Sequence, residues 1–375
     1  MRGATLPKDE LITDAAALAD LCEAIAASPI VAIDTEFIRE RTYYPKPCLI
    51  QIGAEHWAAC VDCIAPLDLS PMLATLLERD RTWVLHSARQ DLEVVWNLTQ
   101  ALPARAIDTQ IAAALLGFPP QLGLQAMLAE LLGINLDKGH TRTDWSRRPL
   151  PEAALSYAFD DVRFLLQAWR ELETRLAALG RLIWLEEDCR RLAADPPVPD
   201  IATIFRRLKA IAGLSERAQC AVLALLEWRE RRARDADRPR RWILTDEQLL
   251  KICRALPASL AQLSAIADLP RGVVARSGAE ILAVIGSSDS TERRGVVESM
   301  LMDRKPDKEK AAVLQDTVHE RARTLGIHPE VLATRRDIVA IAAGAEPATV
   351  LSAWRVRELE MSPAAAALSG VPEPT

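Results

Sequence analysis

The stretch Pro29-Ile30-Val31-Ala32-Ile33-Asp34-Thr35-Glu36 decides the fold of the N-terminal half of this chain. Its first five residues form a short apolar run, which is typical of a buried β-strand. Residues two apart on a strand point to the same face of the sheet, so the side chains of Asp34 and Glu36 leave the sheet together. The sequence therefore predicts a buried strand with a pair of carboxylates on one face at its end.

Two further acidic residues lie in segments with an equally clear pattern. Asp91 follows a second short strand, Trp83-Val84-Leu85-His86, at the opening of a helix. Tyr157 and Asp161 lie in a helical pattern, where residues four apart share one face. Carboxylates that converge on one point repel each other unless a cation lies between them, and hard oxygen ligands suit Mg²⁺ or Mn²⁺. The pattern therefore predicts a two-metal site that cleaves phosphodiester bonds.

The order and context of these residues make the prediction specific. Asp-x-Glu alone is weak evidence, because it occurs three times here, and only the first copy follows an apolar strand. Of the three tyrosines, only Tyr157 has an aspartate four residues on. An isolated tyrosine of this kind would be a half-buried helix residue with its hydroxyl in water. The spacing selects Asp161 over Asp160, which is turned by about 100° and is expected to be solvated or to cap a loop.

Length and composition restrict the class of protein. A chain of 375 residues is expected to form two or three domains. No apolar stretch approaches the ~18 residues of a membrane span, and the N-terminus lacks the pattern of a secretory signal. Seven scattered cysteines favour reduced thiols, and Cys60-x-x-Cys63 has no second pair to complete a metal site. These features predict a cytoplasmic protein that does not enter the membrane.

The charge distribution is uneven. The formal net charge is −6, which argues against general nucleic-acid binding, but residues 201–242 contain eleven Lys/Arg and five Asp/Glu, a balance of +6. This segment could present a phosphate-binding face, or it could be an ordinary solvated helix face. Trp228 and Trp242 flank its arginines and could stack bases, although packing is the more common role of such tryptophans.

The first half alternates short apolar strands with helical patterns. We expect strands at 29–36, 47–53, 57–62, 83–87 and 105–108, and helices at 14–27, 70–79, 89–98, 109–116, 122–132 and 151–177. The second and third strands follow the first after short turns, which predicts an antiparallel edge on an otherwise parallel sheet. The fold class is therefore α/β.

Taken together, these motifs resemble the ribonuclease D family of 3′→5′ exonucleases, whose superfamily is named for four acidic residues and a tyrosine. The matching segments are Val31–Phe37, Pro47–Gly53, Leu85–Val94, Asp144–Leu150 and Tyr157–Asp161. The resemblance is strong over roughly residues 20–180 and continues more weakly to the C-terminus. It implies that the α/β domain has a ribonuclease-H-like architecture with a mixed sheet.

The domain organisation is predicted from a proline cluster and from the helical pattern that follows it. The exonuclease domain is assigned to residues 1–195, because the prolines of segment 195–200 cannot continue a helix and form a stiff linker. Residues 200–286 resemble the helical domain that ribonuclease D shares with RecQ-type helicases, the HRDC domain, through Trp228–Asp235. Residues 287–375 resemble a second, diverged copy. The C-terminal half is therefore expected to be all-α.

The expected cofactors are two divalent ions, Mg²⁺ or Mn²⁺. Asp34 is expected to bridge them, because it stands at the strand end nearest both, and Glu36, Asp91 and Asp161 are expected to complete the ligand shells. By resemblance to the family, Tyr157 hydrogen-bonds and orients the attacking water. With an unperturbed pKa near ~10, its hydroxyl is a poor general base.

A basic stretch before the last predicted helix is a candidate for binding substrate. Lys138 matches a position at which the family contacts substrate near the scissile phosphate. Arg147 and Arg148 could hold phosphates of the terminal nucleotides, or they could satisfy carboxylates or helix ends within the fold. We interpret Trp145 as a core residue, and His86 as a core or supporting residue rather than a catalytic one.

Three functions are compatible with these features. The resemblance favours a 3′→5′ exoribonuclease that acts on RNA with a free 3′ end, expected to be tRNA precursors, and releases nucleoside 5′-monophosphates as a monomer. A DNA 3′→5′ exonuclease is an alternative, because the same site serves proofreading domains. An inactive nucleic-acid-binding scaffold belongs to another class, and the presence of all four acids and the tyrosine argues against it.

Overall fold

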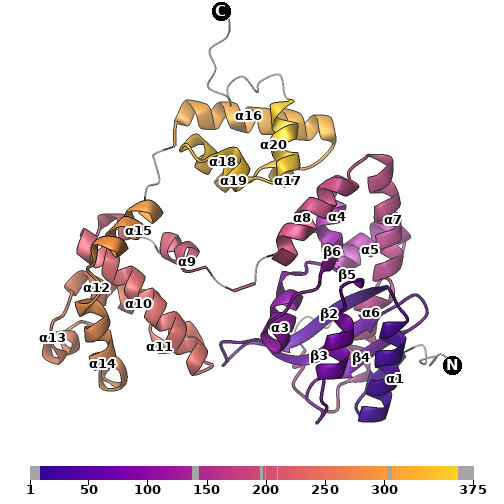
Figure 1. Ribbon diagram of the computed structural model, residues 1–375, viewed down its shortest axis with the longest axis horizontal. Coiled ribbons are helices and arrows are strands. Elements are labelled where there is room, and N and C mark those ends of the chain that lie inside the picture. The colour runs from indigo at the N-terminus through magenta and orange to yellow at the C-terminus, as the bar shows by residue number, and fades with distance from the viewer. Residues whose placement is uncertain are drawn as a thin grey trace, which may run out of the picture. The chain divides into compact units, whose positions relative to one another are not determined.

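The N-terminal half is built on one six-stranded mixed sheet (Figure 1). The computed structural model describes residues 9–136, 143–194, 197–198, 200–208, 210–301 and 306–361. The strands are β1 (Asp9–Ile12), β2 (Ile30–Ile38), β3 (Lys46–Gly53), β4 (Ala58–Asp62), β5 (Thr82–Leu85) and β6 (Arg105–Asp108). Their order is β1-β4-β3-β2-β5-β6, in which β2–β3 and β3–β4 are antiparallel and the other pairs parallel. The predicted mixed sheet is confirmed.

The first strand of the sheet differs from the prediction. β1 pairs in parallel with β4, Asp9 lying opposite Ala58 and Ile12 opposite Val61. The antiparallel strands therefore lie inside the sheet, and the predicted antiparallel edge is wrong. β1 has only four residues, two of them acidic, so its sequence has no strand pattern of its own. Pairing with a strand some 50 residues away makes this segment a strand.

Helices cover both faces of the sheet. They are α1 (Ala15–Ala26), α2 (Ser70–Leu76), α3 (Arg89–Thr99), α4 (Thr109–Leu115), α5 (Leu124–Leu132), α6 (Glu152–Arg163), α7 (Leu165–Ala178) and α8 (Leu182–Ala194). α1, α2 and α3 share one buried apolar core with the sheet, and α4 to α8 contribute to the other. Alternate residues of each strand supply the two cores, as the period of two requires.

The single helix predicted over residues 151–177 is two helices. α6 ends and α7 begins at Phe164, whose φ of −102° and ψ of −5° remain in the right-handed helical region. The hydrophobic pattern continues across such a small change in direction, so the sequence does not reveal the break.

A second unit is formed by residues 198–301 together with the loop 39–45. Its helices are α9 (Ile201–Arg207), α10 (Glu216–Asp235), α11 (Arg240–Ile243), α12 (Asp246–Ala255), α13 (Leu260–Ser264), α14 (Arg271–Gly286) and α15 (Thr291–Leu301). α10 is the longest of these and packs against α9, α11, α12, α14 and α15 around one apolar core. The all-α fold predicted for this region is confirmed. No described helix of the protein is long and apolar enough to cross a membrane.

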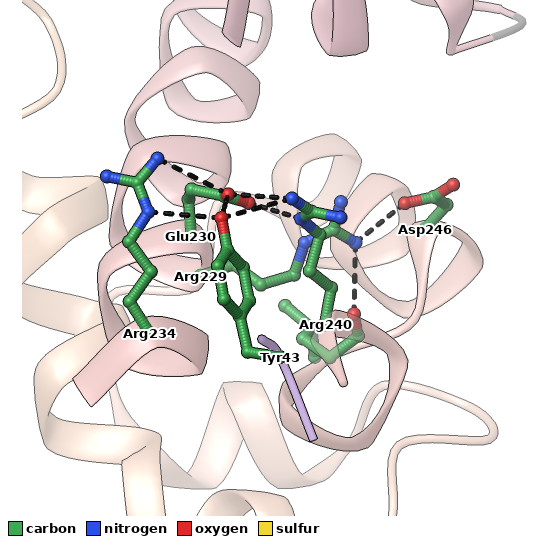
Figure 2. A network of polar contacts seen from close by, with 7 residues as sticks. Tyr43, Arg229, Glu230, Arg234, Arg240 and Asp246 are labelled. Atoms are coloured by element: carbon green, nitrogen blue, oxygen red, sulfur yellow. Dashed lines mark hydrogen bonds and ion pairs between the residues drawn. The ribbon is translucent and has the colours of Figure 1, made fainter. Parts of the chain in front are cut away.

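Residues 39–45, the loop between β2 and β3, are anchored in this helical unit by Tyr43 (Figure 2). The Tyr43 hydroxyl donates a hydrogen bond to the buried Glu230 and accepts hydrogen bonds from Arg234 and Arg240 at 3.1 and 3.2 Å. The Tyr43 backbone N–H donates to Asp237 at 3.0 Å. The loop that follows the strand of Asp34 and Glu36 is therefore part of the helical unit.

The C-terminal helices group with the first unit. They are α16 (Lys308–Leu325), α17 (Pro329–Leu332), α18 (Arg335–Ala342), α19 (Pro347–Val350) and α20 (Ala353–Glu360). Trp354 stacks on Trp184 of α8 with 4.5 Å between ring centroids, and its indole N–H donates to Asp188 at 3.1 Å. The contacts therefore divide residues 287–375 differently from the sequence pattern, with α15 in the helical unit and α16 to α20 on the exonuclease domain. The boundaries at residues 195 and 286 remain predictions.

Candidate active site

The strand β2 presents its two acidic side chains on the face that packs against α6. Ala32 belongs to the core on this face, whereas Val31 and Ile33 belong to the opposite core, so Asp34 and Glu36 share the face of Ala32. Both acids lie inside β2, not at its end as predicted, because pairing with β3 continues to Ile38. Pairing with the parallel strand β5 stops at Ala32, so Asp34 and Glu36 lie in the part of β2 beyond this pairing.

A close approach of α6 to the sheet brings the third carboxylate to this pair. Gly53 of β3 lies opposite Ala32, and a Cβ on Gly53 would lie 2.8 Å from the backbone oxygen of Val162. Only glycine leaves room for the backbone of α6 at this position. Asp161, next to Val162, is thereby placed above β2. Carboxylate oxygens of Asp34, Glu36 and Asp161 all lie within 4.8 Å of one another.

Asp91 lies beside this group of three rather than within it. It is in the first turn of α3, where the helix dipole favours a negative charge. Thr35, the residue between the two acids of β2, donates a hydrogen bond of 2.6 Å from its hydroxyl to the Asp91 carboxylate. Repulsion from Asp91 also raises the pKa of Asp34 and of Asp161. The supporting role of Thr35 was not predicted. The sequence signal for it is its position between the two acids of the Asp-Thr-Glu motif.

The electrostatics of the site favour a cation. Burial is the largest cause of a raised pKa at all four carboxyls, with a value of about 8 at Glu36 and about 7 at Asp91 and at Asp161. The pKa of Asp34 is raised well above its usual range, by burial and then by repulsion from the other three. Within the described residues, no lysine or arginine forms an ion pair with any of the four. Buried oxygen donors without a cationic partner fit divalent metal ions.

Tyr157 lies one helical turn before Asp161, and its hydroxyl is hydrogen-bonded to the Asp161 carboxylate. Burial and the nearby carboxylates raise the pKa of the Tyr157 hydroxyl well above its usual range. The hydroxyl therefore stays protonated and acts as a hydrogen-bond donor. The ring of the buried Trp145 packs near it, with 6.3 Å between centroids, which confirms Trp145 as a core residue.

Asp108 is a supporting residue that the sequence analysis missed. Its carboxylate accepts hydrogen bonds from the backbone N–H groups of Ser87 and Ala88, both at 2.9 Å, and so holds the turn between β5 and α3. This turn positions the helix that carries Asp91. Asp108 also caps α4, and an aspartate directly after a short strand and before a helix is a recognisable capping signal. His86 is hydrogen-bonded through both ring nitrogens to the fold, to the Thr109 hydroxyl and the Leu122 carbonyl.

The predicted substrate-binding residues have different outcomes. Lys138 lies outside the described residues. Arg148 is engaged by the fold: its guanidinium makes two hydrogen bonds of 2.6 Å to Asp62 and a third, of 2.9 Å, to the Cys48 carbonyl. These contacts favour the structural alternative for Arg148, and its role in substrate binding remains a prediction. Arg147 is exposed and remains a prediction.

The remaining acidic neighbour, Asp160, forms an ion pair with Arg163 on the next turn of α6. This ion pair means that Asp160 is not simply solvated, which was one of the two roles expected for it. It also lies outside the group of three carboxylates formed with Asp161.

The arginines of the helical unit divide into two groups. Arg229 is buried and forms an ion pair of 2.6 Å with Asp246 (Figure 2), while Arg234 and Arg240 pair with Glu230. These three stabilise the fold. Trp228 is also structural, because it is buried and its indole N–H donates to Glu280.

A second group of arginines lines a cavity of about 290 Å³ between α10, α11 and α14. Arg232, Arg238 and Arg276 contribute three positive charges to its lining, and Asp235 contributes one negative charge. Trp242 lies in the same lining and is 50% exposed, so it is not the packed core residue that was expected. Among the described residues, Arg238 and Arg276 form no ion pair. Exposed arginines beside an exposed indole are suited to a nucleotide.

Known proteins match both halves of the chain. Residues 10–177 match the family model described as 3′-5′ exonuclease, and residues 221–285 match the HRDC domain. Ribonuclease D of Gluconacetobacter diazotrophicus is 35% identical over 365 residues, which cover 94% of this chain and 91% of that protein. Ribonuclease D of Escherichia coli is 34% identical over 334 residues, 88% of each.

A solved structure matches the fold along nearly the whole chain. The crystal structure of Escherichia coli RNase D, described as an exoribonuclease involved in structured RNA processing, has a TM-score of 0.78 at 29% identity. The match covers 95% of this chain and 99% of that chain. The predicted resemblance and the two predicted fold classes are confirmed.

Proposed function

The chain belongs to the ribonuclease D family, and we propose that it is a 3′→5′ exoribonuclease that hydrolyses the terminal phosphodiester of RNA and releases nucleoside 5′-monophosphates. The observation that carries this proposal is the group of carboxylates Asp34, Glu36 and Asp161, the first two partly buried and the third buried, with oxygens within 4.8 Å of one another and no cationic partner among the described residues. Ionised carboxylates this close repel one another unless cations lie between them.

The four carboxylates would hold two divalent ions, with Asp34 central because the other three all lie near enough to raise its pKa. When bound, Mg²⁺ or Mn²⁺ ions supply a water of lowered pKa and stabilise the charge of the leaving 3′ oxygen. With Asp161 bound to metal, the protonated Tyr157 hydroxyl would donate its one hydrogen bond to the attacking water instead of to Asp161, and so orient that water. The close approach of α6 to β3 at Gly53 places Asp161 beside the two acids of β2.

The substrate is proposed to be RNA with a free 3′ end, in particular tRNA precursors, acted on by a monomer in the cytoplasm. Seven free cysteines in the structure suit a reducing compartment. The cavity of Arg232, Arg238, Arg276 and Trp242 would hold a nucleotide of the RNA away from the cleaved end, through phosphate contacts and base stacking.

The experiment is incubation with 5′-labelled single-stranded RNA and matched DNA, in Mg²⁺, Mn²⁺ or EDTA. We expect RNA to shorten one nucleotide at a time with metal only, and Asp34→Asn to lose nearly all activity. Asp160→Asn is the matched control, because Asp160 adjoins Asp161 but pairs with Arg163. Faster cleavage of DNA would favour the DNA exonuclease, and cleavage of circular RNA would contradict an exonuclease of either kind. Folded Asp34→Asn protein with activity within about tenfold of wild type, ~1.4 kcal/mol, would show the site to be wrong.

A further inference from the structure

Gln51 occupies the centre of the sheet beside the proposed metal site. It lies on β3, directly opposite Asp34 on β2 and Cys60 on β4. Directly opposed residues of antiparallel strands share a face and have Cβ atoms about 4.5–5.5 Å apart. The side chain of Gln51 therefore lies on the face of Asp34, beneath α6, in a row that runs from Asp34 through Gln51 to Cys60.

The amide of Gln51 is buried without a partner. The residue is 0% exposed, and neither its amide nitrogen nor its amide oxygen has a hydrogen-bond partner among the described residues. An amide carries two N–H donors and an acceptor, and leaving them unpaired in the interior destabilises the folded state. Buried polar groups are almost always paired, so an unpaired one in a tightly packed position calls for a physical reason.

The negative charges of Asp34 and Asp161 act on the residues of this row. Burial, followed by repulsion from Asp34 and Asp161, raises the pKa of the Cys60 thiol, which lies beyond Gln51 in the same row. Gln51 is nearer to Asp34 than Cys60 is by one strand. A neutral amide donor is suited to a carboxylate at this place, because a lysine or arginine would compete with a metal ion for the same oxygens.

We propose that Gln51 is a positioning residue for Asp34: its amide N–H donates a hydrogen bond to the Asp34 carboxylate when that carboxylate is ionised and binds metal. Such hydrogen bonds orient a ligating carboxylate and increase metal affinity, and their loss typically weakens binding by 10–100-fold. The inference rests on the proposed function, because it takes Asp34 to be a metal ligand. On this account the Gln51 amide is unpaired in the metal-free protein and gains its hydrogen-bond partner only when metal binds to Asp34.

The test measures Mn²⁺ binding by isothermal titration calorimetry without RNA, and thermal unfolding in EDTA, for the full chain. Gln51→Leu removes the amide at nearly constant volume, and Gln51→Met is the second variant if leucine prevents folding. We expect at least tenfold weaker Mn²⁺ binding, with a Tm in EDTA equal to or above that of the wild type. Cys60→Ala is the matched control, because Cys60 has an equally buried place in the same row, and it should leave Mn²⁺ affinity unchanged.

Two outcomes overturn the proposal. The first is a loss of Mn²⁺ affinity smaller than tenfold in the folded variants. The second is a lower Tm in EDTA for both variants, which would mean that Gln51 supports the metal-free fold. The variant Asp34→Asn separates this inference from the proposed function. If Asp34→Asn loses Mn²⁺ binding and Gln51→Leu keeps it, only the role of Gln51 is wrong. If neither variant changes Mn²⁺ binding, the proposed metal site is wrong as well.

Discussion

Replacing Asp161 by asparagine should change stability in opposite directions with and without a divalent metal. Asp161 is only 6% exposed and lies within 4.8 Å of two other carboxylates. Burial, with added repulsion from neighbouring carboxylates, raises its pKa from 3.8 to about 7. Asparagine has the same shape and can still accept the hydrogen bond of Tyr157, but it carries no charge.

The raised pKa fixes the sign and the size of the effect. Because the pKa of Asp161 is higher in the folded than in the unfolded state, its favourable contribution is complete below pH ~4 and is lost as the pH rises through about 7. Each pKa unit corresponds to about 1.4 kcal/mol, so the loss at pH 8 is at most about 4 kcal/mol. Asp161→Asn removes this penalty. The variant should therefore be more stable than wild type at pH 8 in EDTA and nearly equal to it at pH 4.

The assay is urea-induced unfolding followed by far-UV circular dichroism, in EDTA at pH 4 and pH 8, and again in Mn²⁺ at pH 8. In Mn²⁺ the wild type should gain stability and the variant should gain little, which reverses their order. Asp160→Asn serves as the comparison: Asp160 is paired with Arg163 and acts on Asp161 only by repulsion, so this variant should gain less stability at pH 8 than Asp161→Asn. A variant that is no more stable than wild type at pH 8 in EDTA would refute the reasoning, as would an advantage that does not grow between pH 4 and pH 8.

Four further substitutions test the packing and the proposed RNA contacts. Gly53→Ala should displace α6 and reduce activity at least tenfold with the fold retained. Gly295→Ala, where a Cβ meets nothing within 4 Å, is the control and should leave activity unchanged. Equal activities of the two variants would contradict the close approach of α6. Trp242→Ala and Arg276→Gln, each combined with Asp34→Asn to prevent cleavage, should weaken the binding of tRNA precursors. Arg276→Gln should also reduce the slope of log binding constant against log salt concentration by roughly 0.7–0.9. A salt titration that shows unchanged affinity and slope would mean that these residues form an ordinary solvated face. Trp354→Ala should lower the stability of the exonuclease domain by about 3–5 kcal/mol, because this tryptophan is 0% exposed and stacks on Trp184. Trp242→Ala is the control and should change this stability little. Equal unfolding midpoints of the two variants would show that α20 does not stabilise the exonuclease domain.

The local parts of the site follow from the sequence by itself. A strand places Asp34 and Glu36 on one face because its side chains alternate, and a helix places Tyr157 and Asp161 together because four residues are close to one turn. Both relations hold within a few residues and need no knowledge of the rest of the fold. The same is true of β2 to β6, which have their own apolar patterns, whereas β1 has none. These regularities, with the family resemblance, were sufficient to predict the class of enzyme.

Only the tertiary structure decided which partner each remaining side chain meets. Arg148 binds Asp62 from 86 residues away, and Thr35 binds Asp91 from 56 residues away. The small size of Gly53 matters only because the backbone of α6 crosses it. No local pattern encodes these contacts, because each depends on two segments that become neighbours on folding. For the same reason the sequence could not show which arginines of residues 229–276 stabilise the fold and which line a cavity.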